Sequence, residues 1–300
     1  MATSHGKLVK VNDRNMHIRQ MGDGQKTIVL LPGYGVPLPT VEFAPLMREL
    51  AKKYTVCTVE LAGYGHSDGT DTPRTNENYV QEIRETLILA GLKPPYVLMP
   101  YSASGIYCEY YAAKYPEEVE ALILLDSTPT VEAFAELLAF TEDDAAQMKS
   151  EYESFIMPTG EEYEEVSKAA IAEYVPHGYT EEEVEETNAL LNHANTLIAQ
   201  ALTLSECVLE AMSMPIPKDI PILAFSSDTA KELANLDGEE MDKAEIQRQI
   251  AAHEQYRKDH MARLGGHAKF VIVKDSTHGD IYYHRDYRDI ICDEIDTFLA

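Results

Sequence analysis

Cysteine is scarce in this 300-residue sequence. The four cysteines, Cys57, Cys108, Cys207 and Cys292, lie at least 50 residues apart. This spacing matches no CxxC motif, zinc ribbon or disulfide framework. We therefore expect four free thiols in a reducing compartment and no metal or other cofactor.

Basic residues are also few. Lys and Arg number 25 against 51 Asp and Glu, which gives a formal net charge of −26. Nucleic acids and anionic membranes would be repelled by such a chain, so neither is an expected partner. No apolar run approaches the roughly 18 residues of a membrane span, and the first residues lack the apolar core of a signal peptide. We expect a cytoplasmic protein that acts on a small molecule.

What the sequence does contain is a regular alternation of short apolar runs and helical patterns, which is typical of a mostly parallel sheet covered by helices. Two runs, 8–11 and 16–20, flank a turn signal and predict an opening hairpin. Six further strands are predicted at 27–31, 55–61, 96–99, 121–125, 222–225 and 270–273. The expected sheet therefore has eight strands.

The segment 131–217 interrupts this alternation. It contains no convincing strand and carries 19 Asp and Glu against two Lys. Such a shift in composition between two predicted strands indicates a helical insertion. The carboxylates fit either the solvated outer faces of helices or a site for a cationic substrate.

The stretch 96–115 has the strongest chemical signal. A predicted apolar strand runs into a tight turn around Ser102, and a helix begins directly afterwards. This arrangement lifts the hydroxyl clear of the sheet, and the helix N-terminus favours developing negative charge. It resembles the nucleophile elbow of the α/β-hydrolase superfamily, with Pro100 and Ser104 in place of two glycines. The resemblance implies that Ser102 is a catalytic nucleophile.

The same resemblance implies an oxyanion hole. The strand 27–31 is followed by Pro32-Gly33-Tyr34-Gly35, which is similar to the superfamily's His-Gly loop with Pro32 in place of His. The backbone N–H groups of Tyr34 and of Ala103 would then hold the negative charge that develops on the substrate oxygen.

A general base and an orienting acid complete the expected site. Of ten histidines, only His278 follows the last predicted strand about 20 residues before the final residue, where the superfamily carries its catalytic histidine. Two residues could supply the acid. Asp126 ends the strand after the elbow, whereas Asp228 follows the strand after the insertion and is followed by a capping-box pattern. Turn chemistry and spacing favour Asp126 over Asp228.

The resemblance therefore implies an α/β-hydrolase fold with a mostly parallel eight-stranded sheet, flanked by helices, and a helical cap inserted after the sixth strand. The core would comprise 1–130 and 218–300, and the cap 131–217. The expected activity is that of a carboxylesterase-like serine hydrolase acting on an ester, thioester or amide through an acyl-Ser102 intermediate. The alternatives are an iminopeptidase-like aminopeptidase, an acyltransferase, and a ligand-binding or signalling protein on a catalytically weak hydrolase fold.

Overall fold

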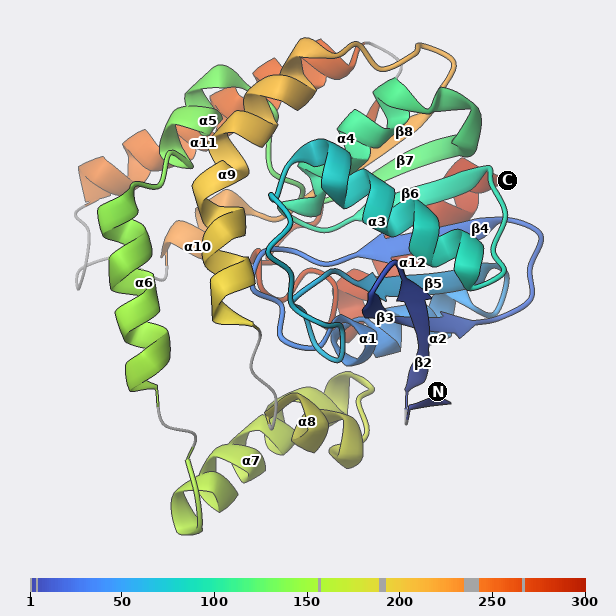
Figure 1. Ribbon diagram of the computed structural model, residues 1–300. Helices are drawn as coiled ribbons and strands as arrows, with labels where there is room; N and C mark the ends of the chain where they lie inside the picture. Colours follow the sequence, from blue (N-terminus) through green and yellow to red (C-terminus); the bar gives the residue numbers. More distant parts are fainter. Residues whose placement is uncertain (1, 4, 156–157, 189–192, 235–242, 266–267) are drawn as a thin grey trace.

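The computed structural model describes residues 2–3, 5–155, 158–188, 193–234, 243–265 and 268–300. Within them lies one sheet of nine strands in the order β1-β2-β3-β5-β4-β6-β7-β8-β9 (Figure 1). The strands are β1 (Ala2–Thr3), β2 (Gly6–Val11), β3 (Arg14–Met21), β4 (Thr27–Leu31), β5 (Thr55–Glu60), β6 (Tyr96–Pro100), β7 (Val119–Leu125), β8 (Ile222–Ser226) and β9 (Lys269–Ile272). The pairs from β1 to β5 along this order are antiparallel, and the remaining pairs are parallel.

The eight predicted strands are all present, with ends that differ by at most two residues. The predicted hairpin is β2 and β3, whose register pairs Val11 with Arg14 across a two-residue turn. Asn12 takes a positive φ of 53° there, which suits an Asn in a tight turn. The ninth strand, β1, has two residues and is too short to give a periodic pattern in the sequence.

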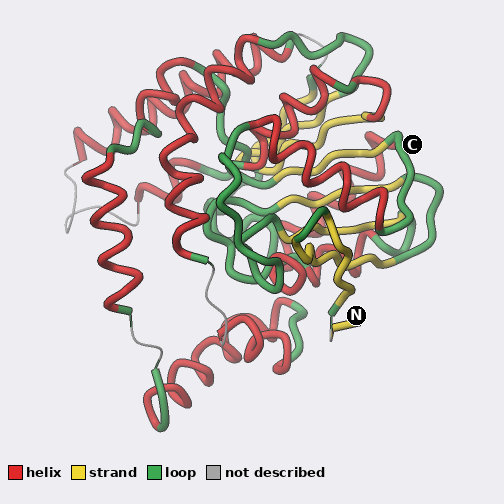
Figure 2. The backbone as a smooth tube through the Cα atoms, in the orientation of Figure 1, coloured by secondary structure: helices red, strands yellow, loops and turns green. Residues whose placement is uncertain are grey.

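The central strands are buried on both faces, which is why they are continuously apolar. Figure 2 shows the sheet between two layers of helices. One apolar cluster joins the sheet to α3 (Asn76–Leu89) and α4 (Ser104–Lys114). A second joins the opposite face to α2 (Ala44–Leu50) and α12 (Arg285–Leu299). This double cover fixes the strand ends on which the candidate site is built.

Between β7 and β8, the described part of 131–217 contains five α-helices and no strand. They are α5 (Glu132–Leu137), α6 (Glu142–Ser154), α7 (Glu161–Tyr174), α8 (Glu181–Asn188) and α9 (Ala194–Ser213). Helix α9 is the most apolar of them and buries Leu197, Leu204 and Val208 in the core cluster. Helices α7 and α8 lie apart from α5 and α6 in Figure 1 and pack near α1 (Pro39–Glu42). No helix in the described part of the chain is long and apolar enough to cross a membrane.

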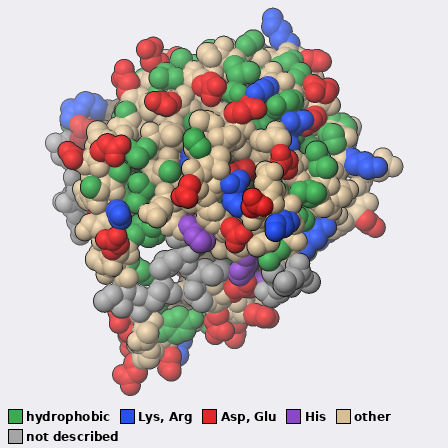
Figure 3. Space-filling model, viewed as in Figure 1, with side chains coloured by type: hydrophobic (Ala, Val, Ile, Leu, Met, Phe, Trp, Pro, Cys, Tyr) green, Lys and Arg blue, Asp and Glu red, His purple; other side chains and the backbone are tan. Residues whose placement is uncertain are grey.

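Between β8 and β9, the described residues form α10 (Thr229–Ala234) and α11 (Lys243–Leu264). Short 3₁₀ turns occupy Pro116–Glu118 and Val175–His177. On the face shown in Figure 3, acidic side chains are spread among Lys and Arg side chains rather than gathered in one patch.

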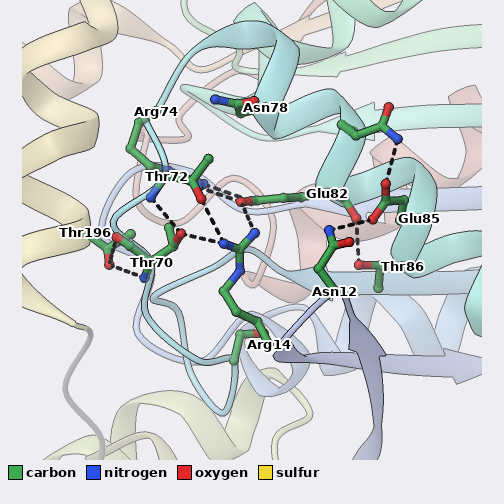
Figure 4. Close-up of polar contacts among 12 residues, drawn as sticks. Asn12, Arg14, Thr70, Thr72, Arg74, Asn78, Glu82, Glu85, Thr86 and Thr196 are labelled. Carbon is green, nitrogen blue, oxygen red and sulfur yellow. Dashed lines mark hydrogen bonds and ion pairs between the residues drawn. The ribbon is translucent and has the colours of Figure 1, made fainter.

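A buried polar network ties the opening hairpin to the helices (Figure 4). Glu82 of α3 accepts hydrogen bonds from Arg14 of β3 at 3.1 Å and from Arg74 at 2.8 Å. The loop before α3 also reaches α9, where the Thr70 backbone N–H donates to the Thr196 hydroxyl at 3.1 Å. The Glu82 carboxylate pairs with both guanidinium groups, so the network leaves no isolated charge. The hydrogen bond between Thr70 and Thr196 adds a contact from the loop before α3 to α9.

Candidate active site

Ser102 occupies the turn between β6 and α4 with a positive φ of 51°. This left-handed conformation is uncommon for a residue with a side chain, and it is the strained turn that a nucleophile elbow requires. Two glycines make room for it. A Cβ at Gly105 would lie 2.5 Å from the Cβ of Ser127, and one at Gly33 would lie 2.9 Å from the Cβ of Ser102. Neither glycine can therefore be replaced without moving the turn.

Pro100 and Ser104, which replace the two glycines of the usual elbow motif, both form hydrogen bonds with neighbouring loops. Ser104 is fully buried, and its hydroxyl donates to the carbonyl oxygen of Pro32 in the loop after β4. The carbonyl oxygen of Pro100 accepts a hydrogen bond from the Ser127 hydroxyl at 3.1 Å. These contacts tie the elbow to the two neighbouring loops, so the replacement of glycine by Pro100 and Ser104 is compatible with the turn.

The structure brings Ser102, His278 and Asp126 together at the carboxyl ends of their strands. The Nε2 atom of His278 lies 3.1 Å from the Ser102 hydroxyl oxygen, and Nδ1 lies 2.6 Å from Oδ2 of Asp126. A carboxylate next to Nδ1 requires the proton on that nitrogen, which leaves Nε2 free to accept the hydroxyl proton. The predicted contact between Asp126 and His278 is thus present.

Asp126 is held from two sides. Its Oδ1 atom accepts the backbone N–H of Ser227 at 2.8 Å, while Oδ2 faces His278. Burial opposes ionisation, but the hydrogen bond and charge of His278 outweigh it and hold the pKa of the Asp126 carboxyl below its ordinary value. Burial likewise disfavours the imidazolium, yet Asp126 raises the pKa of His278 above its ordinary value of 6.5. The pair therefore favours an ionised aspartate.

Asp228 has a different role. Its carboxylate accepts the backbone N–H of Lys231 at 3.4 Å in the first turn of α10 and the backbone N–H of Asp275 at 3.2 Å. It therefore caps a helix, as the capping-box pattern indicated, and does not contact His278.

The two backbone groups predicted for the oxyanion hole belong to Tyr34, which follows Gly33 in the loop next to Ser102, and to Ala103, which directly follows Ser102 in the chain. Among the described residues, neither the Tyr34 N–H nor the Ala103 N–H has a backbone acceptor. The Tyr34 phenol donates to the Leu197 carbonyl oxygen of α9 at 3.2 Å, which anchors this loop under the helical insertion. Their role in binding an oxyanion stays a prediction.

Two contacts of the site were missed by the sequence analysis. The Tyr101 ring stacks on the His278 imidazole with centroids 4.9 Å apart, and its hydroxyl donates to the His278 carbonyl oxygen at 2.7 Å. The Ser227 N–H holds Asp126. The only sequence signal for Tyr101 was its position next to Ser102. The Ser227 contact has no sequence signal, because any residue other than proline supplies a backbone N–H.

A cavity of about 480 Å³ lies beside Ser102 and His278. Phe134 and Leu138 of the insertion line it, so the cavity lies between the insertion and the core. Helices α10 and α11 also line the cavity, although the sequence analysis placed their residues in the core, 218–300, and not in the cap, 131–217. Within the described residues, no group of three or more His, Cys, Asp or Glu side chains could hold a metal ion.

Comparison with known proteins agrees with this fold. The family model for the α/β hydrolase fold matches residues 26–173, which include Ser102 and Asp126. A solved α/β hydrolase fold protein from Chitinophaga pinensis superposes on 99% of this chain and 98% of its own, with a TM-score of 0.63 and 17% identity. The chain belongs to the α/β-hydrolase superfamily.

Curated relatives match about two fifths of the chain. The YbdG protein of Bacillus subtilis (strain 168) is 37% identical over 121 residues, which are 40% of this chain and 37% of that protein. The pimeloyl-[acyl-carrier protein] methyl ester esterase of Shewanella woodyi (strain ATCC 51908 / MS32) is 32% identical over 117 residues, 38% of this chain and 41% of that protein. The chain therefore spans about two fifths of the length of these relatives.

Proposed function

We propose that the protein is a serine hydrolase that cleaves an ester, thioester or amide of a small substrate through an acyl-Ser102 intermediate. The hydrogen-bonded chain from Ser102 through His278 to Asp126 carries this proposal. An esterase among the relatives favours an ester over an amide. Two residues of the elbow motif differ from the usual glycines, and the contacts of Pro100 and Ser104 support a working elbow rather than a distorted one.

Acylation begins at the serine hydroxyl. The Ser102 oxygen attacks the substrate carbonyl carbon while its proton passes to Nε2 of His278. The N–H groups of Tyr34 and Ala103 would bind the resulting oxyanion, and each such donor contributes roughly 3–4 kcal/mol in comparable sites. The bond to the alcohol then breaks, and the alcohol leaves with the proton from Nε2. Asp126 stabilises the transient imidazolium throughout.

Deacylation follows the same steps with water as the nucleophile. His278 Nε2 takes a proton from a water molecule, whose oxygen attacks the acyl carbon of the Ser102 ester. The Ser102 oxygen leaves and recovers its proton from His278, and the acid is released. Tyr101 keeps the imidazole in place during both half-reactions through its stacked ring and its hydrogen bond to the His278 backbone.

The partner of the site is a small molecule, and we propose no nucleic acid or membrane partner and a cytoplasmic location. The cavity volume of about 480 Å³ is within the range of small-ligand pockets. Besides Asp126, only Glu232 supplies a carboxylate among the described lining residues. The acidic insertion therefore gives the cavity little negative charge, which favours an esterase over an aminopeptidase for free-amine substrates.

A fluorophosphonate probe tests the proposal directly. The probe should label the wild-type protein on the peptide that contains Ser102, and Ser102→Ala should not be labelled, because no other described serine in the cavity contacts an imidazole. Intact mass and peptide mapping give the readout, and Ser213→Ala, at the exposed end of α9, serves as the control that keeps its label. Equal labelling of wild type and Ser102→Ala would exclude Ser102 as the nucleophile. Labelling without turnover on a broad ester panel would instead favour the ligand-binding alternative.

The pH dependence of kcat/KM should report His278. Only the neutral imidazole accepts the Ser102 proton, and Asp126 raises the pKa of His278 above 6.5. Activity should therefore fall as the pH is lowered through that raised pKa, about tenfold per pH unit below it. Measuring kcat/KM for the hydrolysis of an uncharged ester from about pH 5 to pH 9 gives this acidic side of the pH dependence. A midpoint below 6.5, or a flat profile, would contradict the assignment of His278 as the base.

A further inference from the structure

The cavity beside the proposed nucleophile is mainly apolar. Its wall includes side chains from the sheet, from α5 and from the α10–α11 segment, among them Leu124, Phe134, Leu138, Phe225, Leu233 and Met261. Such a wall suits the carbon chain of a substrate. A charged side chain at an apolar wall is costly to leave without a charged partner, so it indicates an opposite charge on the ligand.

Arg257 of α11 is the one Lys or Arg among the described residues that line this cavity. Its Nη1 atom donates to the Ser226 hydroxyl at 2.9 Å and to the Ser227 carbonyl oxygen at 3.3 Å. No carboxylate of the described chain lies within ion-pair distance of it, whereas Arg263 on the same helix is paired with the buried Glu109. In a chain with twice as many carboxylates as cations, an arginine in a cavity without an acidic partner is unusual.

The neighbouring groups leave Arg257 as the cation of the cavity. Burial lowers the pKa of His253 and lowers that of His260 to about 4, so both rings are neutral near neutral pH. Glu232 of α10 lines the same cavity, and its carboxylate and the Arg257 guanidinium both act on His253, but the structure gives no ion pair between them. The guanidinium uses one nitrogen for its two protein contacts, and its planar fork matches a carboxylate, which accepts two parallel N–H bonds.

We propose that Arg257 forms a carboxylate-binding subsite in this cavity, so that the substrate is an ester that also carries a free carboxylate, such as the half-ester of a dicarboxylic acid. This inference rests on the proposed function of Ser102. The carboxylate binds the free side of the Arg257 guanidinium, the carbon chain lies along the apolar wall, and the ester reaches Ser102.

Arg257 also has a structural contact that the test must separate from binding. It holds the carbonyl group of Ser227, whose N–H donates to Asp126. A purely structural role would affect all substrates through the position of Asp126. A binding role affects only those that carry the carboxylate.

The experiment compares matched pairs of esters. Each half-ester, from monomethyl succinate to monomethyl adipate, is paired with the methyl ester of the same chain length that ends in a methyl group, from methyl butyrate to methyl hexanoate. The wild type should prefer the half-ester in at least one pair by on the order of 10- to 100-fold in kcat/KM, the size expected for a charge-assisted hydrogen-bonded pair. Arg257→Gln should remove this preference, so that kcat/KM for the half-ester falls about 10- to 100-fold further than kcat/KM for the neutral ester of the same pair, and Arg257→Lys should keep part of the preference. Arg248→Gln is the matched control, because Arg248 is exposed on the same helix and paired with Glu245.

Two results would overturn the subsite: no preference for the half-ester in any pair, or an equal loss of both activities in Arg257→Gln, which would make Arg257 only a support for Ser227. Calorimetric binding of monomethyl adipate and methyl hexanoate to Ser102→Ala gives a readout that does not need turnover. Tighter binding of monomethyl adipate that is lost when Arg257→Gln is added supports the subsite even if Ser102 proves not to be the nucleophile. Equal binding of monomethyl adipate and methyl hexanoate overturns the subsite and leaves the proposed function standing. If Arg257→Gln does not fold, competitive inhibition of the wild type by 6-hydroxyhexanoate over 1-hexanol, which differ by the carboxylate, decides the question.

Discussion

Replacing His278 by alanine is expected to lower kcat by about 10⁶-fold, the size of loss found when the base of such a triad is removed. The physical reason is that no other group can take the Ser102 proton. The His278 Nε2 atom is 3.1 Å from the hydroxyl oxygen, and within the described residues no second imidazole contacts Ser102. Turnover of an uncharged ester under saturating conditions measures the effect.

The matched control is His284→Ala. His284 lies six residues later, at the start of α12, and packs its ring on His177 with centroids 4.2 Å apart. Its loss should leave kcat within about twofold. A circular dichroism spectrum and thermal unfolding of both variants show that the comparison concerns folded proteins. If His284→Ala lost as much activity as His278→Ala, the assignment of the base would be wrong.

Asp126→Asn is expected to lower kcat on the order of 10⁴-fold near neutral pH, whereas Asp228→Asn should change it by less than about threefold. The Ser227 N–H donates to one oxygen of residue 126, so the amide oxygen of the asparagine will stay there. Its NH₂ group then faces Nδ1 of His278 in place of the carboxylate oxygen. An NH₂ donor at this position forces the ring proton onto Nε2, and that nitrogen can no longer accept the Ser102 proton.

Asp228→Asn is an informative control because asparagine is also a good helix N-cap. The substituted side chain can still accept the backbone N–H of Lys231, so α10 should keep its first turn. Steady-state kinetics of the two variants on one ester give the comparison. A larger loss in Asp228→Asn than in Asp126→Asn would show that the carboxylate at 126 is not the one that orients the imidazole during turnover.

The sequence by itself determined the strands and the first two members of the site. Apolar alternation and turn residues are local signals, so they placed eight strands to within two residues and the hairpin turn at Asn12. The turn that carries Ser102 was visible because it joins a predicted strand directly to a predicted helix. His278 was named because it follows the last predicted strand at the place where the superfamily carries its catalytic histidine. The strand and turn signals involve neighbouring residues, whose backbone preferences do not depend on the rest of the chain, and the resemblance to the superfamily then gave the two residues their expected roles.

Only the tertiary structure decided between Asp126 and Asp228 and placed α11 at the cavity. Both aspartates follow strands that are neighbours in the sheet, β7 and β8, so spacing along the chain alone could not exclude either. The difference arises from contacts between different segments of the chain. The Ser227 N–H binds one oxygen of Asp126, whose other oxygen faces His278. The backbone N–H groups of Lys231 and Asp275 bind the carboxylate of Asp228 instead. Arg257 enters the cavity for the same reason, because residues from β7, β8 and α11 meet there only after the sheet has formed.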